Sequence, residues 1–412
     1  MSLHEEWAAR FGTPLYVYDL DRVAAARREL FAALPEGFEL FYALKANPHP
    51  DVARAMREGD GRACRAEISS SGELAAALAA GFAAGECLYT GPGKTDAELD
   101  HALGLGVRMF SVESLGDLRH IGAAACRLGV TAKCLLRINS LTASATTGMR
   151  MTGKPSQFGI DSETLPELMP ELTSVPGAQI AGAHFFTMSN AKDEASLVGE
   201  MQHVIALAAE LQREVGLPLE FLDIGGGFSS PYAVRGERAV YDKLRAELES
   251  ALDVHLPDWR EGAPRLACES GRYLVGDSGS LLTRVVNVKQ SRGGKFVIVD
   301  AGINTLGGLS GLGRLLPASV EVLGEETGDV ANLVGPLCTP GDILGRDIDL
   351  PELVGGELLT VPNVGAYGVT ASLLSFLGRP APAELVVRGE EIVSVSRLEP
   401  RRAFEPIGVA AE

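Results

Sequence analysis

The amino-acid sequence predicts an α/β protein in which a parallel (β/α)8 barrel is followed by an all-β domain. Eight short runs of apolar and β-branched residues alternate with helical patterns between about residues 38 and 270. Eight strand–helix repeats are the number that closes a barrel of this type. After Gly276 the helical patterns give way to short strand-like runs, which indicates a separate β domain. An open, doubly wound sheet is the main alternative to the barrel.

The predicted elements follow this alternation in order. The barrel strands are expected at residues 38–45, 62–69, 86–90, 107–112, 132–138, 179–186, 219–224 and 265–270. Helical periodicity lies between them, at residues 49–60, 70–82, 95–106, 114–129, 192–216 and 238–255. The β domain is expected to begin with a hairpin over residues 281–302 that turns at Gly293–Gly294.

Further strand-like runs of the β domain lie at residues 319–323, 331–335, 356–362, 383–387 and 391–396. Residues 321–330 and 344–356 have the composition of exposed loops. The predicted domains are residues 1–30, an N-terminal segment that packs with the β domain and joins it to the barrel, then 31–272, the barrel, and 273–412, the β domain.

Composition and charge exclude several classes of protein. The chain has 412 residues, 46% of them hydrophobic and 22% charged, which is typical of a folded globular protein. A formal net charge of −17 without a long basic run argues against a nucleic-acid or membrane-surface partner. The six cysteines show neither a zinc pattern nor a disulfide framework, so no metal is expected and the compartment is predicted to be reducing. With no signal peptide and no apolar span, we expect a cytoplasmic protein.

Polar residues follow several of the predicted strands, and in a barrel such strand ends meet at one face. Lys45 closes the first strand, Glu67 and His184 lie in the second and sixth, and Glu269 closes the eighth. A desolvated lysine can form a Schiff base with a carbonyl, including that of pyridoxal phosphate (PLP). Taken singly, Lys45 can also be a strand end that reaches solvent, and His184 a core histidine.

Two further motifs fit the same face of the barrel. The glycines at 225–227 follow the seventh strand, where backbone N–H groups can bind phosphate, although a tight turn would use the same residues. Glu269 can keep a pyridine nitrogen protonated and Arg272 can clamp a phosphate, while a solvated ion pair between the two is the alternative.

The run "GPGKT" at residues 91–95 resembles part of a P-loop. The full motif needs a glycine at position 88, where the sequence has Leu88, so we reject a P-loop. A dinucleotide-binding motif at the triple glycine also fails, because position 230 is Ser230 and not glycine.

Seven motifs in order resemble the fold-type III PLP-dependent decarboxylases, the group of diaminopimelate and ornithine decarboxylases. The motifs are "FYALKAN", "SSGEL", "QFGID", "LDIGGGF", "ESGRY", "GPLCTPGD" and "GAYG", and the resemblance runs from residue 11 to near residue 387. It implies PLP as the cofactor and α-decarboxylation of an amino acid as the reaction, through an aldimine on Lys45 and a quinonoid intermediate.

The resemblance also implies the roles of individual residues. Lys45 is the covalent anchor, His184 stacks on the cofactor ring, and Glu269 faces the pyridine nitrogen. The other implied cofactor-binding residues are Glu67, Thr187, Gly225, Gly226, Gly227, Gly271, Arg272 and Tyr367. Cys338, a plausible proton donor, lies with Thr339, Asp342 and Tyr367 among the implied substrate-binding residues. Because Cys338 and Asp342 reach the active site from the other protomer in this family, a homodimer with shared sites is implied.

The sequence departs from these relatives at two informative positions. Position 67 is glutamate where aspartate is usual. Thr339 replaces the acid that commonly holds the distal ammonium of a diamino acid, and a buried ammonium without its partner would cost several kcal/mol. The tyrosine-rich pattern after residue 300 is also missing.

The segment at 149–161 is more similar to the specialised-pathway branch of the family, which includes decarboxylases of carrier-protein-linked amino acids. Arg150 and Lys154 could contact such a carrier, although solvated basic residues are the alternative. Diaminopimelate decarboxylation in lysine biosynthesis stays the second interpretation of the substrate. A PLP racemase and a non-catalytic regulatory protein of the same fold are the rivals from other classes.

Overall fold

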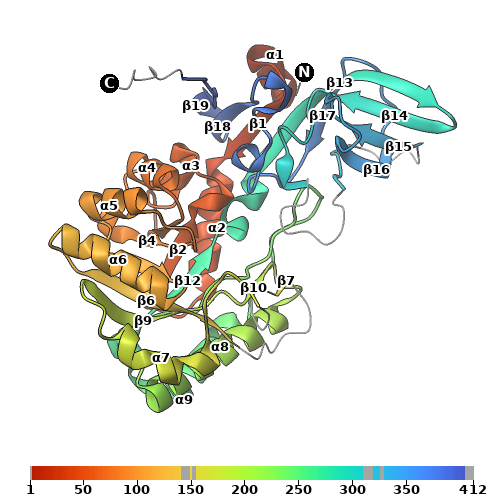
Figure 1. The fold of residues 1–412 in the computed structure, drawn as a ribbon. Helices are drawn as coiled ribbons and strands as arrows, with labels where there is room; N and C mark the ends of the chain where they lie inside the picture. Colours follow the sequence, from red (N-terminus) through yellow and green to blue (C-terminus); the bar gives the residue numbers. More distant parts are fainter. Residues whose placement is uncertain (1, 141–148, 151–154, 310–318, 325–328, 404–412) are drawn as a thin grey trace, which may run out of the picture. The chain divides into compact units, whose positions relative to one another are not determined.

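The computed structural model describes residues 2–140, 149–150, 155–309, 319–324 and 329–403 (Figure 1). The chain forms two compact units. One comprises residues 19–279 and 363–366, and the other comprises residues 1–18, 280–362 and 367–412. We call them the barrel unit and the β unit. The predicted boundaries at residues 30 and 272 therefore differ from the division at 18 and 279.

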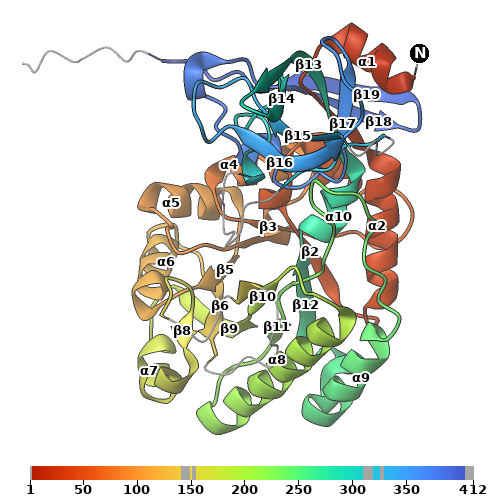
Figure 2. The ribbon, with the colours of Figure 1, turned by 90° about the vertical axis from the view of Figure 1, so that its right-hand side faces the viewer.

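The barrel unit contains a closed ring of eight parallel strands, so the predicted barrel is confirmed and the open sheet is wrong (Figure 2). Its strands pair in the order β5-β4-β3-β2-β12-β11-β9-β6, and β5 pairs with β6 to close the ring. The strands are β2 (Glu39–Ala43), β3 (Arg65–Ile68), β4 (Cys87–Tyr89), β5 (Met109–Val112), β6 (Ala132–Asn139), β9 (Ala178–His184), β11 (Phe221–Asp223) and β12 (Arg265–Ser270). The strand β8 (Ile160–Asp161) extends β6, and β7 (Met149–Arg150) pairs with β10 (Met188–Ser189).

Helices surround the strands of the barrel unit (Figures 1 and 2). They are α2 (Leu20–Ala33), α3 (Pro50–Ala55), α4 (Ser71–Ala79), α5 (Asp96–Leu105), α6 (Leu115–Arg127), α7 (Leu165–Leu172), α8 (Glu194–Val215), α9 (Leu244–His255) and α10 (Arg272–Val275). Several begin where a side-chain oxygen caps the first turn, as Ser70 caps α4 and Thr95 caps α5. The sequence pattern missed α7, because Pro166 and Pro170 disguise its periodicity. The helix expected over 238–255 begins only at Leu244.

The interior of the barrel is filled by apolar side chains of its strands. Buried residues from seven strands form one cluster there: Phe41, Leu88, Met109, Leu135, Ala181, Phe221 and Ala267. The rings of Phe41 and Phe221 meet edge to face, with centroids 6.3 Å apart. At Gly182 in β9 an added Cβ would lie 1.8 Å from the carbonyl oxygen of Phe221 in β11, so only glycine allows these strands to pair.

The β unit is an eight-stranded sheet with helix α1 (Leu3–Phe11). Its strands pair in the order β16-β15-β14-β13-β1-β18-β19, and β17 pairs with β13. They are β1 (Leu15–Asp19), β13 (Gly279–Ser291), β14 (Gly294–Val299), β15 (Asp329–Val334), β16 (Ile343–Leu350), β17 (Leu358–Val361), β18 (Ala383–Arg388) and β19 (Glu391–Arg397). Trp7 of α1 and Leu15 of β1 pack with Leu282 and Leu385, so residues 1–18 share the hydrophobic core of this unit.

The structure corrects three details of the predicted β domain. The hairpin turns at Arg292 and Gly293, which have φ of 50° and 84°, and not at Gly293–Gly294. Residues 319–323 form no strand. The segment expected as a loop at 344–356 is mostly strand β16, whose charged residues suit its position at the edge of the sheet. Part of the other expected loop, residues 325–328, lies outside the described residues.

Among the described helices, none is both long enough and apolar enough to cross a membrane.

Candidate active site

Lys45 lies just past the end of β2, in a short 3-10 turn over Leu44–Ala46. Its ammonium contacts both carboxylate oxygens of Glu67 at 3.1 and 2.9 Å. Glu67 is buried in β3, where the hydroxyl of Thr90 also donates to it. The Lys45 side chain is 41% exposed, so its amine is fixed in place yet open to a reactant.

The ring of His184, at the end of β9, is held from both sides. Its Nδ1 lies 2.6 Å from the hydroxyl of Ser111. Its Nε2 lies 3.3 Å from Oε1 of Glu269, at the end of β12. Neither of these two atoms has a hydrogen-bond partner among the described residues. We therefore regard His184 and Glu269 as a buried ion pair.

Charge attraction stabilises the ionised forms of both groups. Burial alone would lower the pKa of His184, but the Glu269 carboxylate outweighs it and the pKa lies above its ordinary value. Burial alone would raise the pKa of Glu269, but the attraction of His184 holds it below its ordinary value. The two shifts agree, because each describes the charged form of one partner stabilised by the other.

Asp223, at the end of β11, is a third member of this cluster that the sequence analysis did not select. Its Oδ1 accepts the N–H of Gly225 at 2.9 Å, while Oδ2 is buried without a hydrogen bond among the described residues. Burial and the nearby Glu269 raise the pKa of Asp223 to about 7. One ligand-type atom of each of His184, Asp223 and Glu269 lies within 4.8 Å of the other two. The position of Asp223 at the end of a predicted strand is the sequence signal that could have identified it.

The glycines at 225–227 form a loop whose backbone conformation and close neighbours leave no room for larger side chains. An added Cβ on Gly225, with φ of 77°, would lie 2.2 Å from the carbonyl oxygen of Phe185. On Gly226 it would lie 2.7 Å from the carbonyl oxygen of Glu269. The loop therefore presses against the ends of β9 and β12, close to the segment that contains buried Thr187.

Gly271 and Arg272 continue from β12 toward the lysine turn. An added Cβ on Gly271 would lie 2.8 Å from the side chain of Ala46, next to Lys45. Arg272 begins α10, and its guanidinium lies 5.5 Å from the ring centroid of Tyr232. Glu269 faces His184, three residues before Arg272.

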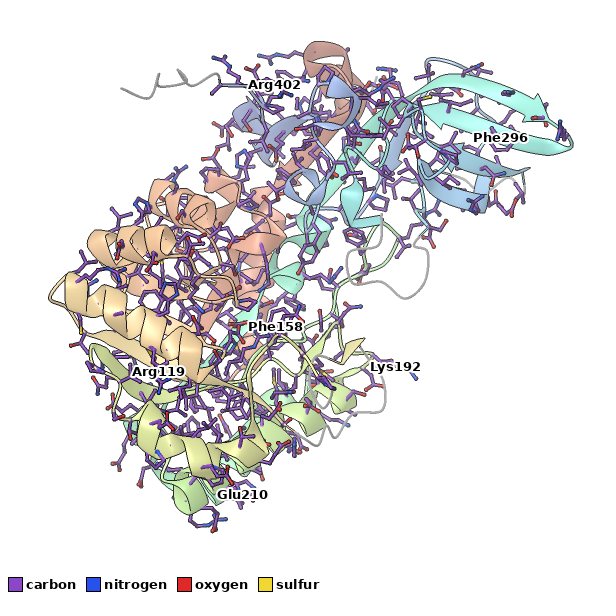
Figure 3. All side chains as sticks on the ribbon, in the orientation of Figure 1. Arg119, Phe158, Lys192, Glu210, Phe296 and Arg402 are labelled. Carbon is purple, nitrogen blue, oxygen red and sulfur yellow. The ribbon has the colours of Figure 1, made fainter. Side chains whose placement is uncertain are left out.

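Arg137, at the end of β6, is a second residue that the sequence analysis missed. Its guanidinium donates to Oε1 of Glu113 at 3.0 Å and lies 4.6 Å from the ring centroid of Phe158. Figure 3 labels Phe158 among the side chains of the barrel unit. The ring of Phe186 lies 5.7 Å from this guanidinium and 5.5 Å from the Lys45 ammonium. The strand-end rule that selected Lys45 applies equally to Arg137 in "LLRIN".

Ten of the eleven residues predicted to bind the cofactor lie in the barrel unit. They are Lys45, Glu67, His184, Thr187, Gly225, Gly226, Gly227, Glu269, Gly271 and Arg272, all from the barrel unit. The other four predicted site residues, Cys338, Thr339, Asp342 and Tyr367, belong to the β unit. Cys338 is exposed and Asp342 is buried, and Tyr367 has φ of 55°, a conformation uncommon for a residue with a side chain.

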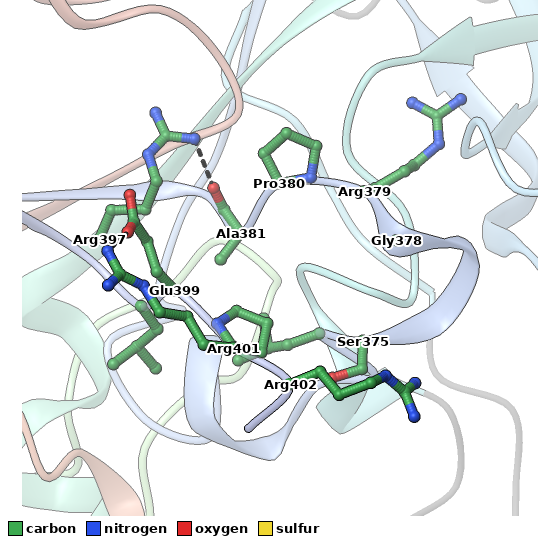
Figure 4. Close-up of a pocket in the computed structure, with 12 residues that line it drawn as sticks. Ser375, Gly378, Arg379, Pro380, Ala381, Arg397, Glu399, Arg401 and Arg402 are labelled. Carbon is green, nitrogen blue, oxygen red and sulfur yellow. Dashed lines mark hydrogen bonds and ion pairs between the residues drawn. The ribbon is translucent and has the colours of Figure 1, made fainter. Parts of the chain in front are cut away.

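The β unit contains a pocket of about 710 Å³ near its C-terminal strand (Figure 4). Arginines dominate its lining, including Arg379, Arg397, Arg401 and Arg402. Arg397 donates to the carbonyl of Ala381 at 2.6 Å. Because none of the predicted site residues lines this pocket, we place the chemistry at the barrel strand ends and not here.

The chain is similar to known proteins over most of its length. The family model for the pyridoxal-binding domain of pyridoxal-dependent decarboxylases matches residues 20–276. The chain is 32% identical over 392 residues to the L-glutamyl-[BtrI acyl-carrier protein] decarboxylase of Niallia circulans, covering 92% of this chain and 90% of that protein. It is 33% identical to the diaminopimelate decarboxylase of Methanothermobacter thermautotrophicus, covering 96% and 91%.

Solved structures agree as well. The diaminopimelate decarboxylase of Helicobacter pylori, complexed with L-lysine, superimposes with a TM-score of 0.80 at 29% identity, over 95% of each chain. The chain therefore belongs to the pyridoxal-dependent decarboxylases. It is a lyase whose cofactor is PLP, as the motifs predicted.

The residues at the barrel strand ends fit this cofactor. Oε1 of Glu269, 3.3 Å from Nε2 of His184, is a buried carboxylate oxygen without a hydrogen bond among the described residues, and a protonated pyridine nitrogen would supply a donor for it. The glycine loop leaves its backbone close to two strand ends without side chains in between. An amine is available at Lys45 for covalent attachment.

Proposed function

We propose that the cluster around Lys45 and Glu269 decarboxylates an amino acid whose side chain does not end in an ammonium group. The observation that carries the assignment of the site is the buried Glu269 carboxylate, whose Oε1 lies 3.3 Å from Nε2 of His184 but accepts no hydrogen bond among the described residues. Bound PLP supplies an electron-accepting ring for the electron pair left behind when carbon dioxide departs.

Each residue of the barrel cluster has a proposed task. Lys45 would hold the cofactor covalently through its amine, and Glu67 orients this amine through two contacts. Glu269 keeps the ring nitrogen protonated, and the ion pair fixes His184 where it can pack on the ring. Gly225, Gly226, Gly227, Thr187 and Arg272 are proposed to bind the phosphate, and the phosphate contact expected of Tyr367, in the β unit, stays a prediction.

Cys338 is proposed to return a proton to the Cα atom of the product. Its thiol is exposed in the described chain, which is compatible with access to a second molecule. The role requires a homodimer in which the β unit of one protomer completes the site of the other, so the dimer is part of the proposal.

The substrate is proposed from Thr339, which gives the Cys338 loop a neutral hydroxyl where a diamino-acid enzyme of this family needs an anion. We infer that a carrier-linked amino acid is the substrate, and the similarity to a decarboxylase of an acyl-carrier-protein-linked glutamyl group supports this choice. Of the two basic residues suggested for carrier contact, Arg150 lies in β7 and Lys154 lies outside the described residues. Free diaminopimelate is the second candidate, supported by several relatives that act on it.

The test measures carbon dioxide released from a panel of substrates by the wild type and by Thr339→Glu. The panel contains free diaminopimelate, ornithine, lysine, arginine and glutamate, beside glutamate attached to a carrier protein. We expect turnover of the carrier-linked amino acid by the wild type. Thr339→Glu should gain about tenfold in kcat/KM for a diamino acid over the wild type, since it restores an anion near the ammonium.

Thr339→Ser is the matched control, because it keeps a neutral hydroxyl and should leave the preference unchanged. Efficient turnover of a free diamino acid by the wild type would refute the proposed substrate while leaving decarboxylation intact. If the protein binds PLP but releases no carbon dioxide from any compound, decarboxylation itself is refuted. Racemisation of a substrate with an unchanged carboxylate would then identify the racemase alternative, and no reaction the regulatory one.

A further inference from the structure

Asp342 ends the loop that carries Cys338, yet its carboxylate points back into the β unit. It is 3% exposed. Its Oδ1 accepts the N–H of Ile303 at 2.8 Å, and its Oδ2 accepts the N–H of Leu337 at 2.7 Å. These distances are typical of strong hydrogen bonds to a charged acceptor. One side chain therefore joins the segment after β14 to the start of the Cys338 loop.

Backbone hydrogen bonds close the same loop on itself. The N–H of Gly335 donates to the carbonyl of Asp342 at 3.0 Å, and the N–H of Asp342 donates to the carbonyl of Thr339 at 3.2 Å. The N–H of Thr339 donates to the carbonyl of Leu337 at 2.9 Å. Cys338 lies at the turn of this closed loop, with its thiol exposed. The position of Cys338 thus depends on a loop that Asp342 closes, through its backbone carbonyl at Gly335 and through its carboxylate at Leu337.

Two glycines leave room for the Asp342 carboxylate and for nothing else. A Cβ added to Gly302 would lie 2.5 Å from Oδ1 of Asp342, and one added to Gly335 would lie 2.3 Å from Oδ2. Real Cβ atoms do not approach an oxygen so closely, so the chain encloses the carboxylate on both sides. A substrate group would need to displace these two backbone segments in order to reach it.

We propose that Asp342 is a positioning residue that fixes the Cys338 loop, and that it does not contact the substrate. This differs from the substrate-binding role that the family resemblance implies for it. The expected effect of Asp342 on catalysis rests on the proposed role of Cys338. The hydrogen bonds of its carboxylate with Ile303 and Leu337 do not depend on that role. The experiment therefore has one readout that is independent of activity.

The first readout is backbone hydrogen exchange of the PLP-loaded protein with Asp342→Asn. An asparagine has one acceptor oxygen and one amide that cannot accept, so one of the two N–H groups loses its partner. We expect exchange in residues 300–306 and 335–343 to accelerate about tenfold or more, with β18 unchanged. Asp347→Asn is the control, because the same chemical change occurs at an exposed aspartate of β16.

The second readout is a double-mutant cycle with Cys338→Ala, measured with the substrate found above. We expect Asp342→Asn to lower kcat about tenfold and to leave KM within about twofold of the wild-type value. In the Cys338→Ala background, the same substitution should lower kcat by less than about twofold. This non-additivity is the signature of a residue that acts through Cys338.

Three outcomes would overturn the proposal. Exchange in the two segments could match that of the Asp347→Asn control, KM could rise in both backgrounds as expected of a substrate ligand, or exchange could accelerate uniformly through the β unit. If Asp342→Asn does not fold, Gly302→Ala gives the same test, because its Cβ forces the carboxylate away. If the wild type proves to be no decarboxylase, the exchange data still decide whether Asp342 holds the loop.

Discussion

The ammonium of Lys45 contacts both carboxylate oxygens of Glu67, 3.1 and 2.9 Å away, across two neighbouring barrel strands. Glu67 is buried and Lys45 is partly exposed, which suits the proposed role of the Lys45 amine as the attachment point of the cofactor. Glutamate is one methylene longer than the aspartate expected at position 67 from the family resemblance. The Glu67 carboxylate contacts the Lys45 amine with this longer side chain.

Lys45→Ala should abolish covalent attachment of PLP. We expect no cofactor to remain on the protein after borohydride treatment and denaturation, and a loss of kcat of about 10³-fold or more, because the amine is the only group proposed for attachment. Mass spectrometry of the treated protein measures the first effect. Lys289→Ala, at an exposed position of β13, is the control and should retain the cofactor. Retention of covalent PLP by Lys45→Ala would place the attachment elsewhere.

Glu269→Gln should separate cofactor binding from catalysis. The amide keeps the shape of the side chain but no longer supplies a negative charge to the ring nitrogen, so we expect kcat to fall about 10²-fold or more while PLP still binds. The pKa of His184 should also fall, since the Glu269 charge is what raises it. Titration of the His184 ring by NMR in the apoprotein measures this second effect. An unchanged His184 titration would show that the two residues do not interact as described.

Glu384 in β18 should make the β unit less stable as the pH rises. Burial raises its pKa from the ordinary 4.5 to about 7, although the hydroxyl of Tyr18, which donates at 3.1 Å, opposes the shift. Between these values the folded chain holds a proton that the unfolded chain has released, so the contribution of Glu384 to stability is greatest below pH 4.5 and is lost as the pH rises through 7. Glu384→Gln should remove this part of the decline, worth up to about 3 kcal/mol.

Chemical unfolding between pH 5 and 8.5 measures the effect of Glu384→Gln. The glutamine can still accept the Tyr18 hydroxyl, so the comparison isolates the charge. Glu391→Gln changes an exposed glutamate on the neighbouring strand β19 and should leave the pH dependence unchanged. Equal slopes for Glu384→Gln and the wild type would contradict the assignment.

Gly182→Ala should disrupt the barrel. The new methyl group would have to displace the backbone carbonyl of Phe221, which lies 1.8 Å from its position, so we expect a loss of several kcal/mol or failure to fold. Gly104→Ala in helix α5 is the control, because an added Cβ there meets no atom within 4 Å. It should stabilise the protein by roughly 0.5–1 kcal/mol, as measured by thermal unfolding. Equal stability of the two variants would contradict the close approach of β9 and β11.

The eight barrel strands could be predicted because each is a short apolar run between helical repeats. The strand-end argument also located Lys45, Glu67, His184 and Glu269 correctly at one end of the barrel. The same argument applies to Asp223 and Arg137, but an acid before three glycines and an arginine within an apolar run carry no distinctive local pattern. Only the pairing of the strands shows that they belong to the cluster.

Features of the β unit were harder to predict because they depend on distant partners. Strand β16 is recognisable only through its pairing with β15, since its charged residues are typical of a loop. Asp342 was selected from its motif, but the direction of its carboxylate depends on Ile303 in another segment. The predicted roles of Cys338, Thr339 and Tyr367 stay predictions.

Strand β1 lies between β13 and β18 in the sheet, although it precedes both by most of the chain. During synthesis its partners leave the ribosome only after the whole barrel unit has been made. Strand β1, the first to be translated, is therefore among the last strands to pair, and its edges stay unpaired while the barrel folds. We expect nascent chains that end before residue 279 to form the barrel. We expect a chaperone to bind their N-terminal segment, which contains the unpaired strand β1.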